Sequence, residues 1–159
     1  MTSTPMAVQE SSPRPAATTR SSARLERMAL LYGRIALGVA FLSGIADRFG
    51  LYWGRNVGYG NFAGFMDYTA KVNSFMPAST IPFLAWAATA AEFCFGVALV
   101  LGLWTRWAAL GSSALLVLFG VAMAISFGIK SPLDYSVFSA SAAALMIYAF
   151  ESRKIGARS

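Results

Sequence analysis

Four apolar stretches, each long enough to cross a bilayer as a helix, dominate this sequence. They cover residues 28–46, 81–103, 107–127 and 133–150. A transmembrane helix needs about 20 predominantly apolar residues. Hydrophobic residues make up 57% of the chain and charged residues only 13%, so a membrane explains the composition better than the core of a soluble domain does. We therefore predict an all-α integral membrane protein built as a bundle of four transmembrane helices.

The segments outside these stretches define the expected domain organisation. Residues 1–27 are rich in Ser, Thr, Pro and Arg, a composition that cannot bury enough apolar surface to offset the cost of ordering, and we predict a disordered tail. Residues 28–151 form the membrane domain, with 47–80 as a long outer segment, and residues 152–159 form a second tail. The first apolar stretch starts too late for a signal peptide, so we expect it to remain as an anchor.

The positive charge of the chain indicates topology rather than nucleic-acid binding. Lys and Arg residues are retained preferentially on the cytoplasmic side of a membrane. With both ends inside, eight Lys and Arg residues lie in inner segments and four in outer segments, with one more inside the first span. We therefore predict an N-in, C-in arrangement, with membrane lipid as a partner and no nucleic acid.

Glu92 lies inside the second stretch, in a run with no other charge between Lys71 and Arg106. It shares a helical face with three small residues, Ala85, Ala88 and Gly96. Small residues let helices approach closely in lipid, so this face is predicted to point into the bundle. The first stretch has a similar row of small residues along one helical face, which we call a small-residue stripe; it consists of Ala36, Ala40 and Gly44.

Two environments for Glu92 remain open. The acid could pair with Arg34 of the first helix, or Arg34 could extend to the inner surface and leave Glu92 protonated. A protonated acid needs a hydrogen-bond acceptor, and Thr89, Ser139 and Ser141 are the candidates at a similar depth. A polar lock within the bundle is one interpretation. The other is a catalytic, proton-accepting Glu92 in a ligand site with Arg34, Thr89, Ser139 and Ser141, because ionisable groups inside membranes are often functional.

The outer segment is rich in aromatic and glycine residues. Its second half has apolar side chains at helical spacing, and we predict an interfacial helix over residues 61–76 with Asp67 and Lys71 on the opposite face. The segment is interpreted either as an aromatic anchor at the headgroups or as a lid over a pocket between the helices.

The chain contains one cysteine and no histidine. Haem and most zinc and iron sites need histidine ligands, and dithiol exchange needs a second cysteine. We therefore expect no metal site and no intrinsic cofactor. Cys94 stands between Phe93 and Phe95 and is expected to be a small buried hydrophobic residue.

At residues 28–151 the chain resembles the DoxX family of small bacterial membrane proteins. The resemblance is carried by GRIALGVAFLSG with Arg34, Gly38, Phe41 and Gly44, by AEFCFGVALVLGLWTRWAAL with Glu92, Gly96, Gly102, Thr105 and Arg106, and by SPLDYSVFSASAAAL. The family often has a lysine after the first-helix glycine, in a GxxK pattern, where this chain has GIADR with Asp47 followed by Arg48.

The resemblance implies a bacterial inner-membrane protein with a quinone-linked redox role. Some relatives are subunits of a thiosulfate:quinone oxidoreductase, which implies a redox protein partner, a bound quinone and a polar core of Arg34 and Glu92. By this analogy the chain is at most one subunit of an oxidoreductase. The alternatives are a non-catalytic assembly or scaffold protein and, less favoured, a small-solute transporter, which would require a homo-oligomer.

Overall fold

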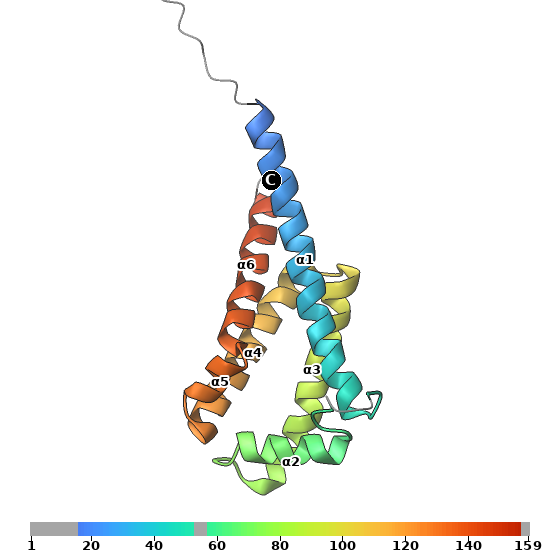
Figure 1. Cartoon of the computed structure of the whole chain (residues 1–159), viewed down its shortest axis with the longest axis vertical. Helices are drawn as coiled ribbons and strands as arrows, with labels where there is room; N and C mark the ends of the chain where they lie inside the picture. Colours follow the sequence, from blue (N-terminus) through green and yellow to red (C-terminus); the bar gives the residue numbers. More distant parts are fainter. Residues whose placement is uncertain (1–15, 53–56, 157–159) are drawn as a thin grey trace, which may run out of the picture.

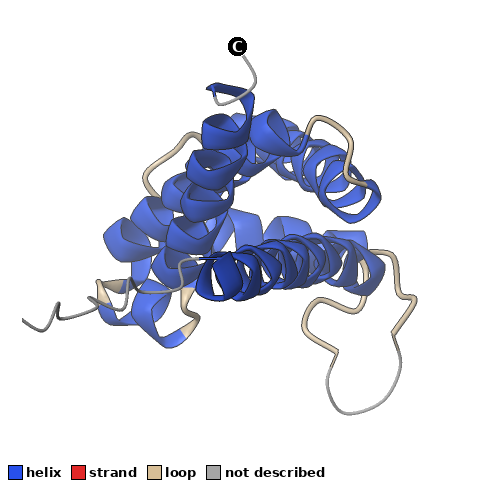
Figure 2. Ribbon diagram, turned by 90° about the horizontal axis from the view of Figure 1, so that it is seen from above, coloured by secondary structure: helices blue, strands red, loops and turns tan. Residues whose placement is uncertain are grey.

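A computed structural model describes residues 16–52 and 57–156 of the chain. These ranges contain helices and no strand (Figure 2), as predicted for an all-α protein. The elements are α1 (Ala16–Arg48), α2 (Phe62–Val72), the 3-10 helix η1 (Ala78–Thr80), α3 (Ile81–Leu101), α4 (Thr105–Phe127), α5 (Lys130–Asp134) and α6 (Val137–Gly156). The predicted tail residues 1–15 and 157–159 lie outside the described residues.

Three helical segments are long and apolar enough to cross a membrane. They are the Ser21–Arg48 part of α1, η1 together with α3 (Ala78–Leu101), and α4. They coincide with the first three predicted stretches, which confirms those predictions apart from a few residues at most ends. The first helix differs more, because it begins at Ala16 and not at Met28. Residues 16–27 therefore belong to a helix and not to a disordered tail.

The fourth predicted stretch is divided between two helices. The short helix α5 contains Pro132, and a turn at Ser136, whose φ is +55°, separates it from α6. Because α6 begins at Val137, its last turns carry Glu151 and Arg153. It is not among the three candidate spans found in the described residues.

The long helices pack side by side, and α2 lies across one end of them (Figure 1). Helix α1 packs on α3, α3 on α4, and α4 on α6. The α1–α3 contact is close at two glycines, where a Cβ placed on Gly38 would lie 2.8 Å from the carbonyl oxygen of Gly96. Small residues at this contact allow the two backbones to approach.

The small-residue stripes were predicted correctly on α3 but only in part on α1. The α3 stripe faces inward, with Ala85, Glu92 and Gly96 buried. On α1, Ala36 and Ala40 are exposed, and only Gly44 of the predicted set faces α3. The buried core between the helices consists mainly of Leu37, Phe41, Leu99, Ala109, Leu116, Ala144 and Ile147.

Large apolar side chains cover the outside of α3 and α4. The exposed members include Phe83, Trp86, Phe93, Leu118 and Ile125. Contiguous apolar surface of this kind is unfavourable in water and favourable against lipid chains. The chain is therefore a membrane protein that contacts lipid through these helices.

Helix α2 confirms that the outer segment contains a helix, although it ends at Val72 and not at residue 76. Asn61 caps its N-terminus by accepting a hydrogen bond from the backbone N–H of Gly64 at 2.8 Å. Its buried face consists of Phe65, Thr69 and Val72. Asp67 and Lys71 are exposed, as the helical periodicity predicted.

Candidate functional site: a buried ion pair beneath α2

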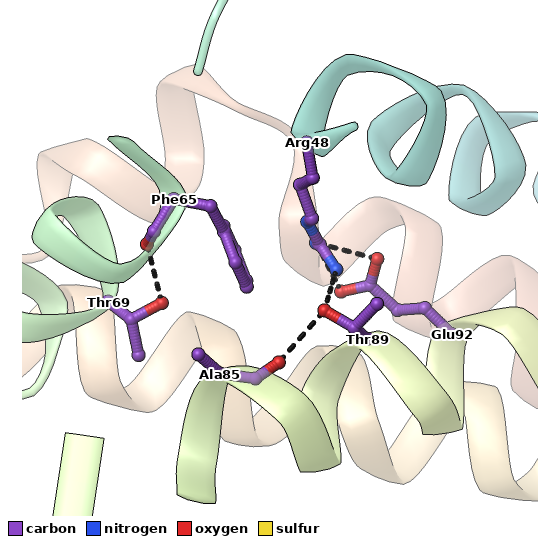
Figure 3. A network of polar contacts seen from close by, with 6 residues as sticks. All are labelled: Arg48, Phe65, Thr69, Ala85, Thr89 and Glu92. Carbon is purple, nitrogen blue, oxygen red and sulfur yellow. Dashed lines mark hydrogen bonds and ion pairs between the residues drawn. The ribbon is translucent and has the colours of Figure 1, made fainter. Parts of the chain in front are cut away.

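An ion pair between Arg48 and Glu92 lies where α2 meets α1 and α3. Nη2 of Arg48 donates to both carboxylate oxygens of Glu92, at 2.8 and 2.7 Å (Figure 3). Nη1 of Arg48 donates to the hydroxyl of Thr89 at 3.0 Å. The side chains of Arg48 and Glu92 are only 6% and 4% exposed. Water therefore screens this pair far less than it screens a surface ion pair.

The direction in which helical side chains lean brings the two charges together. A side chain on an α-helix tilts toward the N-terminus of its own helix. Arg48 is the last residue of α1, so it leans back along α1 toward the bundle. Glu92 lies in α3, which runs the opposite way, so it leans toward the end of the bundle covered by α2. The two side chains converge from opposite directions.

Helix α2 covers the pair with an aromatic ring. The guanidinium carbon of Arg48 lies 3.7 Å from the ring centroid of Phe65 (Figure 3), which is a cation–π contact. The hydroxyl of Thr69 donates to the carbonyl of Phe65, and the hydroxyl of Thr89 donates to the carbonyl of Ala85. Nε of Arg48 is buried and has no hydrogen-bond partner in the described chain. One donor of the pair is therefore unused.

Asp47, the neighbour of Arg48, holds the loop that leads to α2. Its carboxylate accepts hydrogen bonds from the backbone N–H groups of Gly58, Tyr59 and Gly60, the shortest at 2.9 Å. This arrangement places Tyr59 beside Arg48, with 6.0 Å between the guanidinium carbon and the ring centroid. Burial raises the pKa of Tyr59 to about 12, with Tyr68 adding to the rise and Arg48 opposing it.

Arg34 is not the partner of Glu92. Its guanidinium packs against the backbone of Gly102 at the end of α3, where a Cβ on Gly102 would lie 2.9 Å from Nη1. The negative end of the α3 dipole at this position favours a cation. Of the two open alternatives for Arg34, pairing with Glu92 is thus wrong, and Arg34 lies near the α3–α4 turn.

The other predicted site residues fall into two groups. Thr89 does belong to the site, as the acceptor for Arg48. Ser141 instead pairs with Ser113 of α4, with 3.1 Å between their hydroxyl oxygens, and Ser139 is exposed. Neither serine contacts Glu92. Cys94 is exposed as well, contrary to the expectation that it would be buried.

Three residues of the site were missed by sequence reasoning. Arg48 lies two positions beyond the predicted end of the first stretch and was counted as an outer loop residue. Tyr59 and Phe65 were considered only as members of an aromatic-rich segment. One signal could have identified Arg48. A residue at the C-terminal end of a helix tilts back toward the N-terminus of that helix, so Arg48 should point toward the bundle and not away from it.

Two cavities lie near the α3–α4 turn, away from the ion pair. One has a volume of about 110 Å³ and the other of about 330 Å³. The smaller cavity is lined by residues of α1, α4 and α6 that include Arg27, Arg34 and Glu151. The larger is lined mainly by Trp104, Arg106, Trp107 and Glu151. The described residues contain no group of three or more Cys, Asp or Glu side chains placed to hold a metal ion.

Comparison with curated proteins and with solved structures gives no match. The model of one family, DoxX, matches residues 29–127. The matched region contains both members of the ion pair, the covering helix α2 and the contact between α1 and α3. It spans more than half of the chain, and the motifs on which the resemblance rested lie mostly within it. The chain therefore belongs to the DoxX family.

Proposed function

We propose that this protein is a non-catalytic membrane subunit whose role is structural, and that the Arg48–Glu92 pair locks its outer segment onto the helix bundle. One observation carries the proposal: Nη2 of Arg48 contacts both oxygens of Glu92, directly beneath Phe65 of α2. The lock joins the end of α1, the middle of α3 and the covering helix. A partner protein that docks on the outer segment would then meet a fixed surface.

Glu92 is poorly suited to accept a proton while this pair is intact. Both of its oxygens receive hydrogen bonds from a guanidinium, and the residue is 3% exposed. Protonating the acid would leave the Arg48 charge buried without a counter-ion, which costs several kcal/mol in proteins. These contacts support a lock more than they support a proton relay.

The proposed topology has four spans with both ends in the cytoplasm of a bacterium, in its inner membrane. Helix α6 has 20 residues, a length of about 30 Å at a rise of about 1.5 Å per residue, and its last turns with Glu151 and Arg153 would lie in the headgroup region rather than in the hydrocarbon core. Its exposed residues Leu145 and Met146 suit contact with lipid. Helix α2, with one buried face and charged residues on the other, suits the outer headgroup region.

A quinone-linked redox role is the second candidate, and one specific observation favours it. Nε of Arg48 is a buried donor without a partner, close to the rings of Phe65 and Tyr59. A quinone carbonyl is an acceptor and its ring stacks on aromatic side chains, so a quinone would complete this environment. In that case, electrons would come from a redox partner protein.

One double variant separates the two candidates. Arg48→Met combined with Glu92→Leu removes both charges together, and each new side chain is apolar and of similar size, so neither charge remains unpaired. The protein is purified gently from its native membrane, and quinone in an organic extract is measured by mass spectrometry. Circular dichroism and thermal unfolding report whether each sample is folded.

The structural proposal expects the double variant to fold and to retain the same amount of quinone as the wild type. It also expects Glu92→Gln alone to lower the melting temperature, because Arg48 is then unpaired. A double variant that folds but loses stoichiometric quinone would overturn the structural proposal and establish the quinone candidate. Lys130→Gln, which removes an exposed charge on α5, serves as the control in both measurements.

A further inference from the structure

The two cavities near the α3–α4 turn have a positively charged lining that the ion-pair site does not use. Arg27 and Arg34 line the smaller cavity, Arg106 lines the larger, and Glu151 borders both. Three arginines and one glutamate leave a net charge of +2 at this position. An anion is therefore the complementary ligand.

The guanidinium groups of Arg34 and Arg106 are held in place by neutral contacts. Arg34 packs against the backbone of Gly102, whose φ of +76° and lack of a Cβ make room for it. Arg106 lies 4.9 Å from the ring centroid of Trp107 and 5.6 Å from that of Tyr148. Neither arginine forms an ion pair within residues 16–52 and 57–156, and the Nε atom of each is buried without a hydrogen-bond partner. The buried Nε atoms are out of reach of a ligand, so the donors of each guanidinium that can meet an acceptor are its Nη groups.

The surroundings of the cavities are those of a membrane surface. The α3–α4 turn joins two candidate spans, so it lies where the chain leaves the hydrocarbon region. Trp104 is 83% exposed and Trp107 is 60% exposed, with Leu103 exposed beside them. Tryptophan is enriched at the headgroup level because its ring is apolar and its N–H is polar. A ligand with both a charged head and an apolar tail fits this position better than a small free anion does.

We propose that these cavities bind the headgroup of an anionic phospholipid. Arg34 and Arg106 donate hydrogen bonds to its phosphate oxygens, since arginine presents several donors in a planar group that matches a phosphate. The acyl chains then lie along the exposed apolar side chains around Leu103.

The test uses the full chain, purified in mild detergent and stripped of lipid. Native mass spectrometry measures how much phosphatidylglycerol and how much phosphatidylcholine remain bound when both are supplied equally. The wild type is expected to prefer phosphatidylglycerol. Arg34→Gln and Arg106→Gln are each expected to lower that preference about fivefold, the ratio that corresponds to about 1 kcal/mol per basic residue near a charged membrane surface. Arg24→Gln removes an exposed arginine of α1 that lines neither cavity and is expected to leave the preference unchanged.

Three results would overturn the proposal. The first is a wild-type protein that binds the two lipids equally. The second is an Arg24→Gln variant that loses as much preference as the cavity variants, which would indicate diffuse attraction to the surface. The third is release of phosphatidylglycerol by millimolar inorganic phosphate, which would assign the site to a free anion. Thermal unfolding in phosphatidylcholine alone identifies any variant that fails to fold, and the two cavity arginines provide independent tests.

Discussion

Removing one charge of the Arg48–Glu92 pair should destabilise the protein far more than removing both. The closest N–O distance is 2.7 Å, which places the charge centres about 4 Å apart. At that separation and an effective dielectric constant of about 20, the attraction is about 4 kcal/mol. Glu92→Gln leaves Arg48 buried and unpaired, and variants of this type lose about 3 to 5 kcal/mol.

The double variant Arg48→Met with Glu92→Leu should lie within about 1 kcal/mol of the wild type, because paired removal leaves no isolated charge and apolar replacements fill the space. Thr89 remains satisfied in this variant, since its hydroxyl still donates to the carbonyl of Ala85 at 2.8 Å. The assay is equilibrium unfolding in mixed micelles, followed by circular dichroism, for the wild type, the two single variants and the double variant.

An exposed ion pair provides the matched control. Lys130 and Asp134 are one turn apart on α5, with side chains 83% and 57% exposed. Asp134→Asn should cost less than about 0.5 kcal/mol, because water and salt screen such a pair. If Glu92→Gln costs no more than this control, or if the double variant is as unstable as the single ones, the reasoning about a buried lock is refuted.

Three further predictions concern other parts of the fold. Gly102→Ala should destabilise the protein by roughly 1 to 2 kcal/mol, the cost of a left-handed backbone, because the Arg34 guanidinium that its Cβ meets is the end of a flexible side chain and can shift. Gly128→Ala meets no atom within 4 Å, but Gly128 has a φ of +84° and a ψ of 160°, a conformation nearly confined to glycine. It should therefore show a backbone cost of its own, without a side-chain clash, in the same thermal unfolding experiment. Tyr59 should titrate near pH 12 by phenolate absorbance. Since its folded pKa exceeds the unfolded value near 10, its contribution to stability is present below pH 10 and is lost as the pH rises to about 12. Tyr59→Phe should abolish both the absorbance change and this loss of stability. Ser141→Ala should cost about 0.6 kcal/mol, a typical value for one hydrogen bond between membrane helices, and a loss above about 2 kcal/mol would contradict this assignment.

The features that could be predicted from the sequence depend on regular spacing. The lengths of the apolar stretches located three spans, and the small residues around Glu92 correctly placed that acid inside the bundle. Helix α2 followed from apolar residues at helical spacing, with Asp67 and Lys71 on the outer face. In each case a local pattern was sufficient, because the period of the helix determines which side chains share a face.

The features that could not be predicted depend on contacts between distant segments. Arg48 pairs with a residue 44 positions away, and its place just beyond an apolar stretch made it resemble an ordinary loop cation. The N-terminal extension of α1 was missed because composition alone suggested disorder. Adding residues to an existing helix is inexpensive compared with starting one, and Ala, Arg, Leu and Glu are good helix formers. The turn at Ser136 between α5 and α6 has a φ of +55°, and no periodic pattern in the sequence predicts a positive φ at a serine.

Because Glu92 follows Arg48 by 44 residues, the ribosome releases Arg48 before its partner. At about 5 to 20 residues per second, Glu92 leaves the ribosome roughly 2 to 9 seconds after Arg48. During that interval Arg48, at the end of α1, can remain among the lipid headgroups, where a guanidinium is tolerated. We expect Glu92 then to enter the bilayer with its counter-ion close by. The first helix is therefore expected to make insertion of an acidic helix more favourable.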